Sequence, residues 1–135
     1  MAEKRLSVTH TGTGMVMEAR TSGGIALTVD GDGEAGASPM ELLLAATGAC
    51  ALVDVDIILR KKRLVFSDLR VECVGTRPDE GTPKPYHDIR LVFSVKGDVP
   101  AKAFDDAVRL SVEKYCSVGE TVRKGAPVRY EARVG

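Results

Sequence analysis

The sequence predicts a mixed α+β fold, because the spacing of its apolar residues changes along the chain. Apolar residues recur at every second position over residues 15–20 and 25–30, as in strands. A long apolar stretch with helix signals at both ends follows over residues 39–62. The chain has 135 residues, the length of one domain, so we expect a single domain over residues 1–135.

The N-terminal third is predicted to form a β-meander. The stretches Thr21–Gly24 and Asp30–Gly33 are rich in residues that favour turns, and they follow the two alternating segments. Short strands joined by such turns pair with their neighbours along the chain.

A long helix is predicted from Pro39 to Lys62. Ser38 and Glu41 form a capping box around Pro39, which suits the first helical position. Basic residues at the other end favour the negative end of the helix dipole. Because the first half is apolar on every side, we expect a buried central helix that a second copy of the chain covers in a homodimer.

A β-hairpin is expected after this helix. Leu69, Val71 and Cys73 share one face of a first strand, and every second residue of 89–95 is apolar. The turn-rich segment 78–85 separates the two strands.

The C-terminal part is predicted to hold a helix from Pro100, a short helix and a final strand. The short helix begins at the second capping box, Ser117–Glu120, and ends near Gly125. The final strand is expected over 127–134. The inner stripe of the helix from Pro100 is expected at Phe104, Val108, Ser111 and Tyr115.

Charge and hydropathy exclude several classes of partner. The chain has 19 Lys and Arg and 19 Asp and Glu, so it lacks the basic excess of a nucleic-acid-binding protein. Its longest uncharged apolar run, 42–53, is shorter than the roughly 20 residues that span a bilayer. We therefore expect no nucleic acid and no membrane as partners. The three cysteines are odd in number and include no C-x-x-C pair, which is typical of a cytoplasmic protein with free thiols.

The acidic glycine-rich segment before the long helix matches two ligand-binding patterns only superficially. Gly31 to Gly36 fits a dinucleotide fingerprint, but Asp32 and Glu34 would repel a pyrophosphate. A calcium loop starting at Asp30 would need glycine where Ala35 stands. The two histidines also lack the spacing of a zinc site, so we expect no cofactor and no metal.

The three cysteines differ in context. Cys73 falls on the inward face of its predicted strand, which a structural role explains. Cys50 lies in the long helix with Asp54 one turn later, and Cys116 precedes the second capping box, where a helix N-terminus stabilises a thiolate. Cys50 and Cys116 suggest a peroxidatic and resolving pair. Spacing does not show that they meet, and a Cys50–His87 hydrolase pair stays open.

Two segments resemble the OsmC/Ohr family, the osmotically induced and organic-hydroperoxide-resistance proteins. The residues are ASPMELLLAATGAC (37–50) and EKYCSV (113–118), and the resemblance runs from about Gly24 to the C-terminus. It implies an intertwined α+β homodimer with its central helices back to back and two active sites at the interface.

The resemblance also implies a reaction. Cys50 corresponds to the peroxidatic cysteine of a thiol-dependent hydroperoxide reductase, and Cys116 to the resolving cysteine. The implied partners are a small hydroperoxide and an external dithiol reductant, in defence against oxidative stress. The alternative is a dimeric protein that binds an apolar ligand at the interface without turnover.

The group that activates the thiol departs from the family pattern. In peroxide-reducing members a Glu directly follows the Pro and pairs with an Arg from the N-terminal loop. Here Met40 follows Pro39, and Glu41 comes one residue later. Glu41 and Arg20 are the nearest equivalents. Two further candidates, Asp54 and Arg77, are hypothetical replacements for the usual pair.

Overall fold

The computed structural model describes residues 1–135 and has the mixed α and β architecture that the sequence predicts. It contains two compact units, residues 1–45 and residues 46–135, and each is described by itself. Helix α1 (Pro39–Lys61) begins in the first unit and continues in the second. That one domain spans the whole chain stays a prediction.

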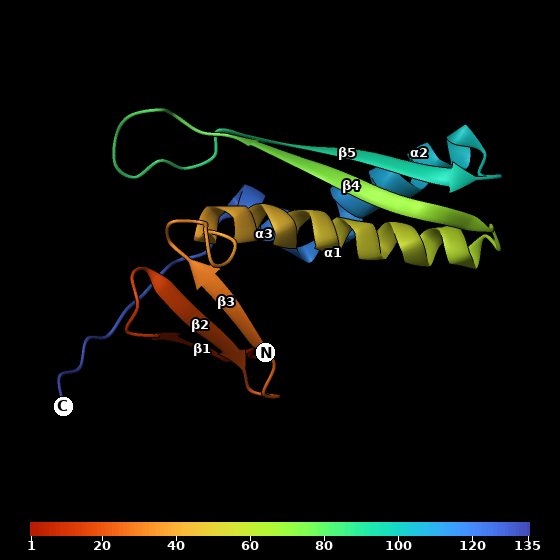
Figure 1. The fold of residues 1–135 in the computed structure, drawn as a ribbon. Coiled ribbons are helices and arrows are strands. Elements are labelled where there is room, and N and C mark those ends of the chain that lie inside the picture. Colours follow the sequence, from red (N-terminus) through yellow and green to blue (C-terminus); the bar gives the residue numbers. More distant parts are fainter. The chain divides into compact units, whose positions relative to one another are not determined.

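The first unit is a three-stranded antiparallel meander in the order β1–β2–β3, seen in red and orange in Figure 1. Its strands are β1 (Leu6–His10), β2 (Val16–Thr21) and β3 (Ala26–Asp30). The alternation of apolar residues predicted β2 and β3 but not β1. The alternation of Leu6 and Val8 with polar residues is the signal that could have found this edge strand.

The start of α1 confirms the predicted capping box. The Glu41 carboxylate accepts a hydrogen bond from the Ser38 backbone N–H at 3.0 Å, and the Ser38 hydroxyl accepts one from the Glu41 N–H at 3.2 Å. This reciprocal pair satisfies two backbone donors that helix geometry leaves without an intrahelical partner.

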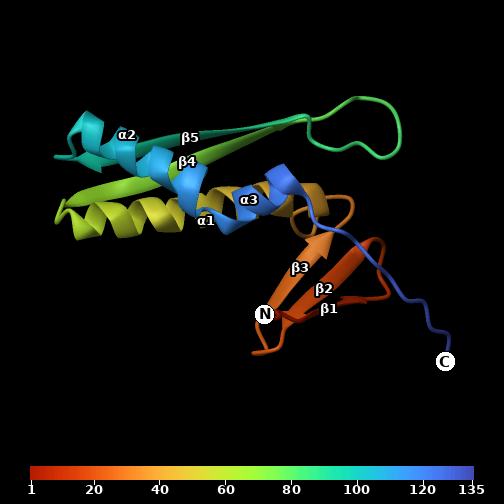
Figure 2. The same ribbon diagram turned by 180° about the vertical axis from the view of Figure 1, so that it is seen from behind.

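The second unit packs α1 against a β-hairpin and two further helices. The hairpin pairs β4 (Phe66–Thr76) with β5 (Asp88–Gly97), and its inward residues alternate as predicted. Helices α2 (Ala101–Leu110) and α3 (Ser117–Lys124) lie on one side of α1, in front of it in Figure 2. The core of this unit contains the buried residues Val55, Leu59 and Ala107.

A π-helical turn, η1 (Ser111–Tyr115), connects α2 and α3. The Cys116 N–H donates to the Ser111 carbonyl at 2.8 Å, five residues back, so the turn holds one residue more than an α-turn. The extra residue shifts the helical phase. Phe104, Val108 and Ser111 face inward as predicted, but the prediction for Tyr115 was wrong, because its side chain is 50% exposed.

The final strand predicted over 127–134 does not form in this chain. Residues 125–135 carry no regular secondary structure, and Val128, Tyr130 and Val134 are more than 90% exposed. A strand needs a neighbour to accept and donate its backbone hydrogen bonds, and neither sheet of the chain includes this segment. Its alternating pattern therefore predicted a strand that has no partner within one chain.

One face of α1 remains apolar and exposed. Val53 and Ile57 are 58% and 44% exposed, while Thr47, Ala51, Val55 and Leu59 form the buried stripe of the same helix. The helix has the length and hydropathy of a membrane span, and only 28% of its most apolar window is buried in the single chain. The core helix of a soluble protein can have the same length and hydropathy, so these two properties do not indicate a membrane span. The exposed apolar face of α1 needs some other cover.

Candidate functional site

Cys50 and Cys116, far apart in the sequence, interact in the second unit. Helix α1 carries Cys50, and Cys116 lies between η1 and α3. The two thiols lie close enough for Cys50 to influence the pKa of Cys116 directly. Cys116 is only 3% exposed, whereas Cys50 is half-buried. The fold thus brings together the two thiols whose meeting the sequence left open.

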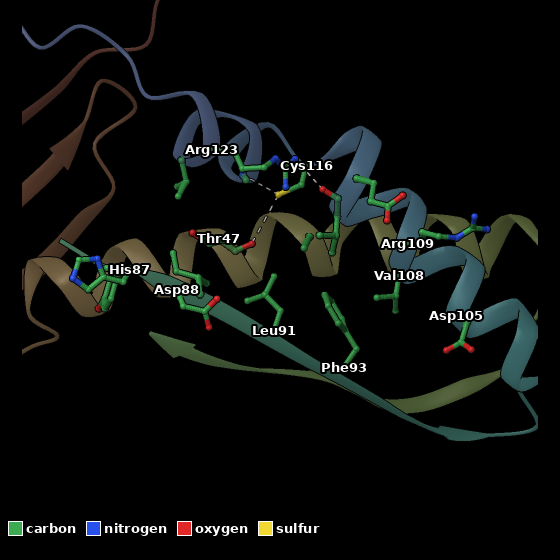
Figure 3. A pocket seen from close by; sticks show the side chains of 17 residues that line it. Thr47, His87, Asp88, Leu91, Phe93, Asp105, Val108, Arg109, Cys116 and Arg123 are labelled. Atoms are coloured by element: carbon green, nitrogen blue, oxygen red, sulfur yellow. Dashed lines mark hydrogen bonds between the residues drawn. The ribbon is translucent and has the colours of Figure 1, made fainter. Parts of the chain in front are cut away.

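Backbone groups fix the position of the Cys116 sulfur. As the N-cap of α3, it accepts a hydrogen bond from the Gly119 N–H at 3.2 Å. Its thiol also lies 3.9 Å from the Thr47 carbonyl oxygen of α1. Figure 3 shows both contacts as dashed lines. The sulfur is therefore held between the start of α3 and the side of α1.

Burial raises the pKa of the Cys116 thiol above the usual value of a cysteine. The Gly119 N–H opposes the rise, while the Cys50 thiol and the charge of Asp54 add to it. The sequence predicted a thiolate stabilised by the N-terminus of α3. That prediction was wrong, because burial outweighs the single N–H donor. At neutral pH Cys116 is a neutral thiol.

Ser111 links α1 to the π-turn below Cys116. Its fully buried hydroxyl donates to the Ala51 carbonyl at 2.7 Å, with the Asp54 carboxylate at 3.4 Å. Its own carbonyl accepts the Cys116 N–H. The sequence pattern placed Ser111 in the inner stripe of its helix and did not indicate this role. A lone hydroxyl among apolar positions was the available signal.

The four candidate activating residues lie in different places. Asp54 belongs to the cysteine site, where its charge acts on Cys116. Glu41 belongs to the first unit, where hydrogen bonds from Ser38 lower its pKa, and its carboxylate serves the helix cap. Arg20 also belongs to the first unit and pairs with Glu18 at 2.7 Å. Arg77 is exposed just beyond β4.

A cavity of about 900 Å³ opens beside Cys116. Figure 3 shows Leu91 and Phe93 projecting from β5 and Val108 from α2 into the space next to the helices. Charged groups lie along its margin, among them Arg109, which pairs with Asp106 at 2.9 Å. The full lining is Thr47, Ala51, Tyr86, His87, Asp88, Ile89, Leu91, Phe93, Asp105, Val108, Arg109, Val112, Glu113, Cys116, Gly119, Val122 and Arg123.

Two residues that line the cavity, Arg123 and His87, differ in what they contact. The Arg123 guanidinium donates to the Val112 carbonyl at 3.0 Å and reaches Glu120 at 3.4 Å, so it ties α3 to the π-turn. His87 lines the same cavity at the start of β5, but the thiols contact each other and backbone groups rather than its ring. The geometry favours a dithiol site over a Cys50–His87 hydrolase pair.

Cys73 has a different environment. Its thiol packs against Gly48 of α1, and a Cβ atom at that position would collide with its sulfur. Burial raises the pKa of Cys73, and the Gly48 backbone opposes the rise. The small pair Gly48 and Cys73 lets the hairpin approach α1 closely.

In the acidic loop before α1, the Asp30 carboxylate binds backbone groups of the loop itself. Asp30 is 4% exposed and accepts hydrogen bonds from the backbone N–H groups of Asp32, Glu34 and Ala35 at 2.8 to 3.2 Å. These donors lower its pKa. The side chain that a calcium loop would place first therefore closes the turn instead.

Comparisons with known proteins agree with this architecture. A family model described as OsmC-like protein matches residues 31–131. Protein YhfA of Escherichia coli K12 is 35% identical over 123 residues, which are 90% of this chain and 91% of YhfA. The crystal structure of a protein from Aquifex aeolicus VF5 has a TM-score of 0.81 at 37% identity, covering 93% of this chain and 90% of that one.

A more distant structure has the same fold. An organic hydroperoxide resistance protein from Elizabethkingia anophelis has a TM-score of 0.67 at 14% identity, covering 93% of this chain and 91% of that one. This likeness shows the fold alone, whereas the family model and the 35% identity to YhfA show the family. Together they confirm the resemblance first seen in the two cysteine segments: the chain belongs to the OsmC-like family.

Proposed function

We propose that this protein reduces organic hydroperoxides to alcohols with Cys50 and Cys116 as a redox pair. The observation that carries the proposal is the contact between the two thiols, one on α1 and one at the start of α3. The adjoining cavity, with Leu91, Phe93 and Val108 in its wall, suits the apolar part of an organic hydroperoxide. The family also includes proteins described by organic hydroperoxide resistance.

Cys50 is proposed as the thiol that attacks the peroxide. It is the more exposed of the pair, and the raised pKa of Cys116 makes that thiol the poorer nucleophile at neutral pH. The Cys50 thiolate attacks the terminal peroxide oxygen. The O–O bond breaks, the alkoxide takes a proton and leaves as the alcohol, and Cys50 becomes a sulfenic acid.

Cys116 then completes the reaction. Its sulfur attacks the sulfur of the Cys50 sulfenic acid, the S–O bond breaks, and water leaves with the proton of the Cys116 thiol. An external dithiol reduces the resulting disulfide, so the cycle needs no bound cofactor or metal. Such a reductant implies a reducing compartment, which fits a cytoplasmic protein.

A homodimer fits the exposed apolar face of α1. The most apolar window of this helix has a mean hydropathy of 2.1, yet only 28% of it is buried in the single chain. Val53 and Ile57 lie on the exposed side, where a second copy of α1 is the proposed cover. Segment 127–134, which pairs with no strand of its own chain, also has the sequence pattern of a strand and could pair with a second copy.

The test is peroxide consumption by the reduced protein. Cumene hydroperoxide should consume two of the three thiols, and turnover should follow when a dithiol is supplied. Cys73→Ser is the matched control and should react like the wild type, while Cys50→Ser should be inactive. Equal peroxide consumption by Cys50→Ser and the wild type would overturn the proposal.

The second candidate is a dimeric protein that binds an apolar ligand without turnover. It is favoured by the engagement of Glu41 in a helix cap and of Arg20 with Glu18, since the family pattern uses such a pair to activate the thiol. Unchanged thiol counts after excess peroxide, together with a fatty acid or lipid that copurifies in the mass spectrum, would favour this function.

A further inference from the structure

Cys116 borders two separate cavities. Besides the large cavity, a smaller one of about 400 Å³ lies next to it, and Cys116 is the only residue that both share. The smaller cavity is lined by Lys114, Tyr115, Cys116, Ser117, Glu120, Thr121, Lys124, Gly125 and Ala126. We call the first the apolar cavity and the second the basic groove.

Helix α3 separates the two spaces. Gly119, Val122 and Arg123 line the apolar cavity, whereas Glu120, Thr121 and Lys124 line the basic groove. These residues alternate around the helix, so one face borders each space. Cys116, as the N-cap, lies at the point where the two faces meet.

We propose that the external reductant enters through the basic groove and attacks the Cys116 sulfur of the Cys50–Cys116 disulfide. The inference rests on the proposed function, in which that disulfide forms. It assigns the two spaces to two different reactants: the hydroperoxide to the apolar cavity and an anionic thiol to the basic groove.

The direction of attack supports this assignment. Thiol–disulfide exchange is a displacement at sulfur, in which the entering thiolate approaches opposite the leaving sulfur. The apolar cavity includes Thr47 and Ala51 of α1, the helix that carries Cys50, but no residue of α1 lines the basic groove. An attacker in the groove therefore reaches Cys116 from the side away from the α1 residues that flank Cys50.

The exchange balances as two displacements. The entering thiolate forms a bond to the Cys116 sulfur, the Cys50–Cys116 bond breaks, and Cys50 leaves as a thiolate. A second thiol, from the same dithiol or another molecule, attacks the reductant's own sulfur in the mixed disulfide. Cys116 leaves, the reductant becomes a disulfide, and the two thiol protons pass to the two protein cysteines.

Charge favours an anionic thiol in the groove. Lys114 and Lys124 are both exposed there, and Glu120 is the one acidic side chain in the lining. Glu120 already pairs with Lys124 at 3.3 Å and with Arg123 at 3.4 Å, and these cations lower its pKa. The surroundings of Cys116 on this side are therefore net positive.

The attacked sulfur can be identified directly. The disulfide is first formed with diamide, so the test does not depend on a reaction with peroxide. The oxidised protein is then treated with 2-mercaptoethanesulfonate, quenched in acid and alkylated. Trypsin places Cys50 in Thr21–Arg60 and Cys116 in Tyr115–Arg123. We expect the sulfonate adduct on Cys116 and the alkyl group on Cys50, and the reverse pattern would overturn the proposal.

The charge of the groove is tested by comparing thiols. Reduction rates with 2-mercaptoethanesulfonate and with cysteamine are each divided by the rate of the same thiol on a small neutral disulfide. The corrected ratio of the anionic thiol's rate to the cationic thiol's rate should be roughly threefold to sevenfold. Each of the two lysine charges in the groove should change this ratio by about twofold in water. It should fall to about one in Lys114→Gln/Lys124→Gln.

The matched control is Lys61→Gln/Lys62→Gln, which removes the same charge at exposed positions outside both cavities. It should keep the wild-type ratio. An equal loss of preference in both double variants would mean that net charge, not the groove, selects the thiol, and would overturn this part of the proposal. Failure of peroxide to form the disulfide would instead count against the proposed function alone.

Discussion

Cys73 and Cys116 of the second unit each lie against a glycine, but their surroundings differ. Cys73 packs on Gly48 of α1, and burial is the main influence on its thiol. Cys116 lies beside Gly119 and also contacts Thr47 and the Cys50 thiol. Burial raises the pKa of both thiols, so burial does not separate a chemical cysteine from a packing one. The second thiol and the adjoining cavities make that distinction.

The largest difference is expected in oxidation chemistry. Cys116→Ser should stop disulfide formation and leave Cys50 as a sulfenic acid, because the proposed resolving thiol is removed. Cys73→Ser should form the disulfide at the wild-type rate. A dimedone adduct on Cys50, detected by mass spectrometry in Cys116→Ser alone, is the measurement. A persistent adduct in Cys73→Ser as well would remove the distinction between the two cysteines.

Gly48→Ala should destabilise the protein through packing. Its new methyl group would collide with the Cys73 sulfur and crowd Val71, and such overpacking costs about 1–3 kcal/mol. Removing the sulfur in Gly48→Ala/Cys73→Ala should recover most of the loss in the free energy of unfolding, measured in urea. Additive losses in the double variant would show that the contact with Cys73 is not the cause.

Gly119→Ala is the matched test beside Cys116. A Cβ there would meet the Cys116 sulfur at 3.3 Å, which a small shift can relieve, and the backbone N–H donor is kept. We expect a smaller loss of stability than for Gly48→Ala. A loss as large as that of Gly48→Ala would show that Cys116 is packed as rigidly as Cys73.

Ser111→Ala should cost about 1–2 kcal/mol of unfolding free energy, because it removes the buried hydroxyl that joins the Ala51 carbonyl to the π-turn. Since that turn holds Cys116, the rate of disulfide formation should fall as well. Ser117→Ala, at an exposed position, is the control and should change neither quantity. An unchanged rate of disulfide formation in Ser111→Ala would show that this hydroxyl does not help to position Cys116.

The smallest effect is expected for Asp54→Asn. The Asp54 charge contributes to the raised pKa of Cys116, so its removal should lower that pKa, and alkylation of Cys116 should rise at a lower pH than in the wild type. Peptide-resolved alkylation with iodoacetamide between pH 7 and 10 measures the shift. A shift toward higher pH would contradict the assigned influence of Asp54.

The same raised pKa has a consequence for stability. Because folded Cys116 holds its proton more tightly than the unfolded chain does, its contribution is fully present below the unfolded cysteine pKa of about 8.5. That contribution is lost as the pH rises through the higher folded value. The free energy of unfolding should therefore decline in this alkaline range, and the decline should be weaker in Cys116→Ser.

Local patterns in the sequence were enough to predict most of the fold. The capping box at Ser38 and Glu41 fixed the start of α1, and alternation in 89–95 identified β5, because both signals depend on neighbours in the chain. The segment 127–134 was mispredicted for the complementary reason. Its pattern suits a strand, but a strand forms only where another chain segment pairs with it.

The site was less predictable because it depends on contacts between distant segments. Cys50 and Cys116 were identified by their contexts, yet the two thiols come together only when α3 packs on α1. The π-turn that begins at Ser111 breaks the regular helical spacing, so the sequence pattern placed Tyr115 on the wrong side. The two cavities on either side of α3 likewise correspond to no pattern of neighbouring residues in the sequence.

Disulfide mapping after one equivalent of cumene hydroperoxide tests the central claim most directly. Trypsin separates the three cysteines into Thr21–Arg60, Val71–Arg90 and Tyr115–Arg123, because Arg77 and Lys84 precede prolines. We predict one cross-linked species that joins the Cys50 and Cys116 peptides, with Cys73 recovered as a free thiol. A cross-link through Cys73, or three free thiols after the peroxide, would contradict the assignment of a Cys50–Cys116 redox pair.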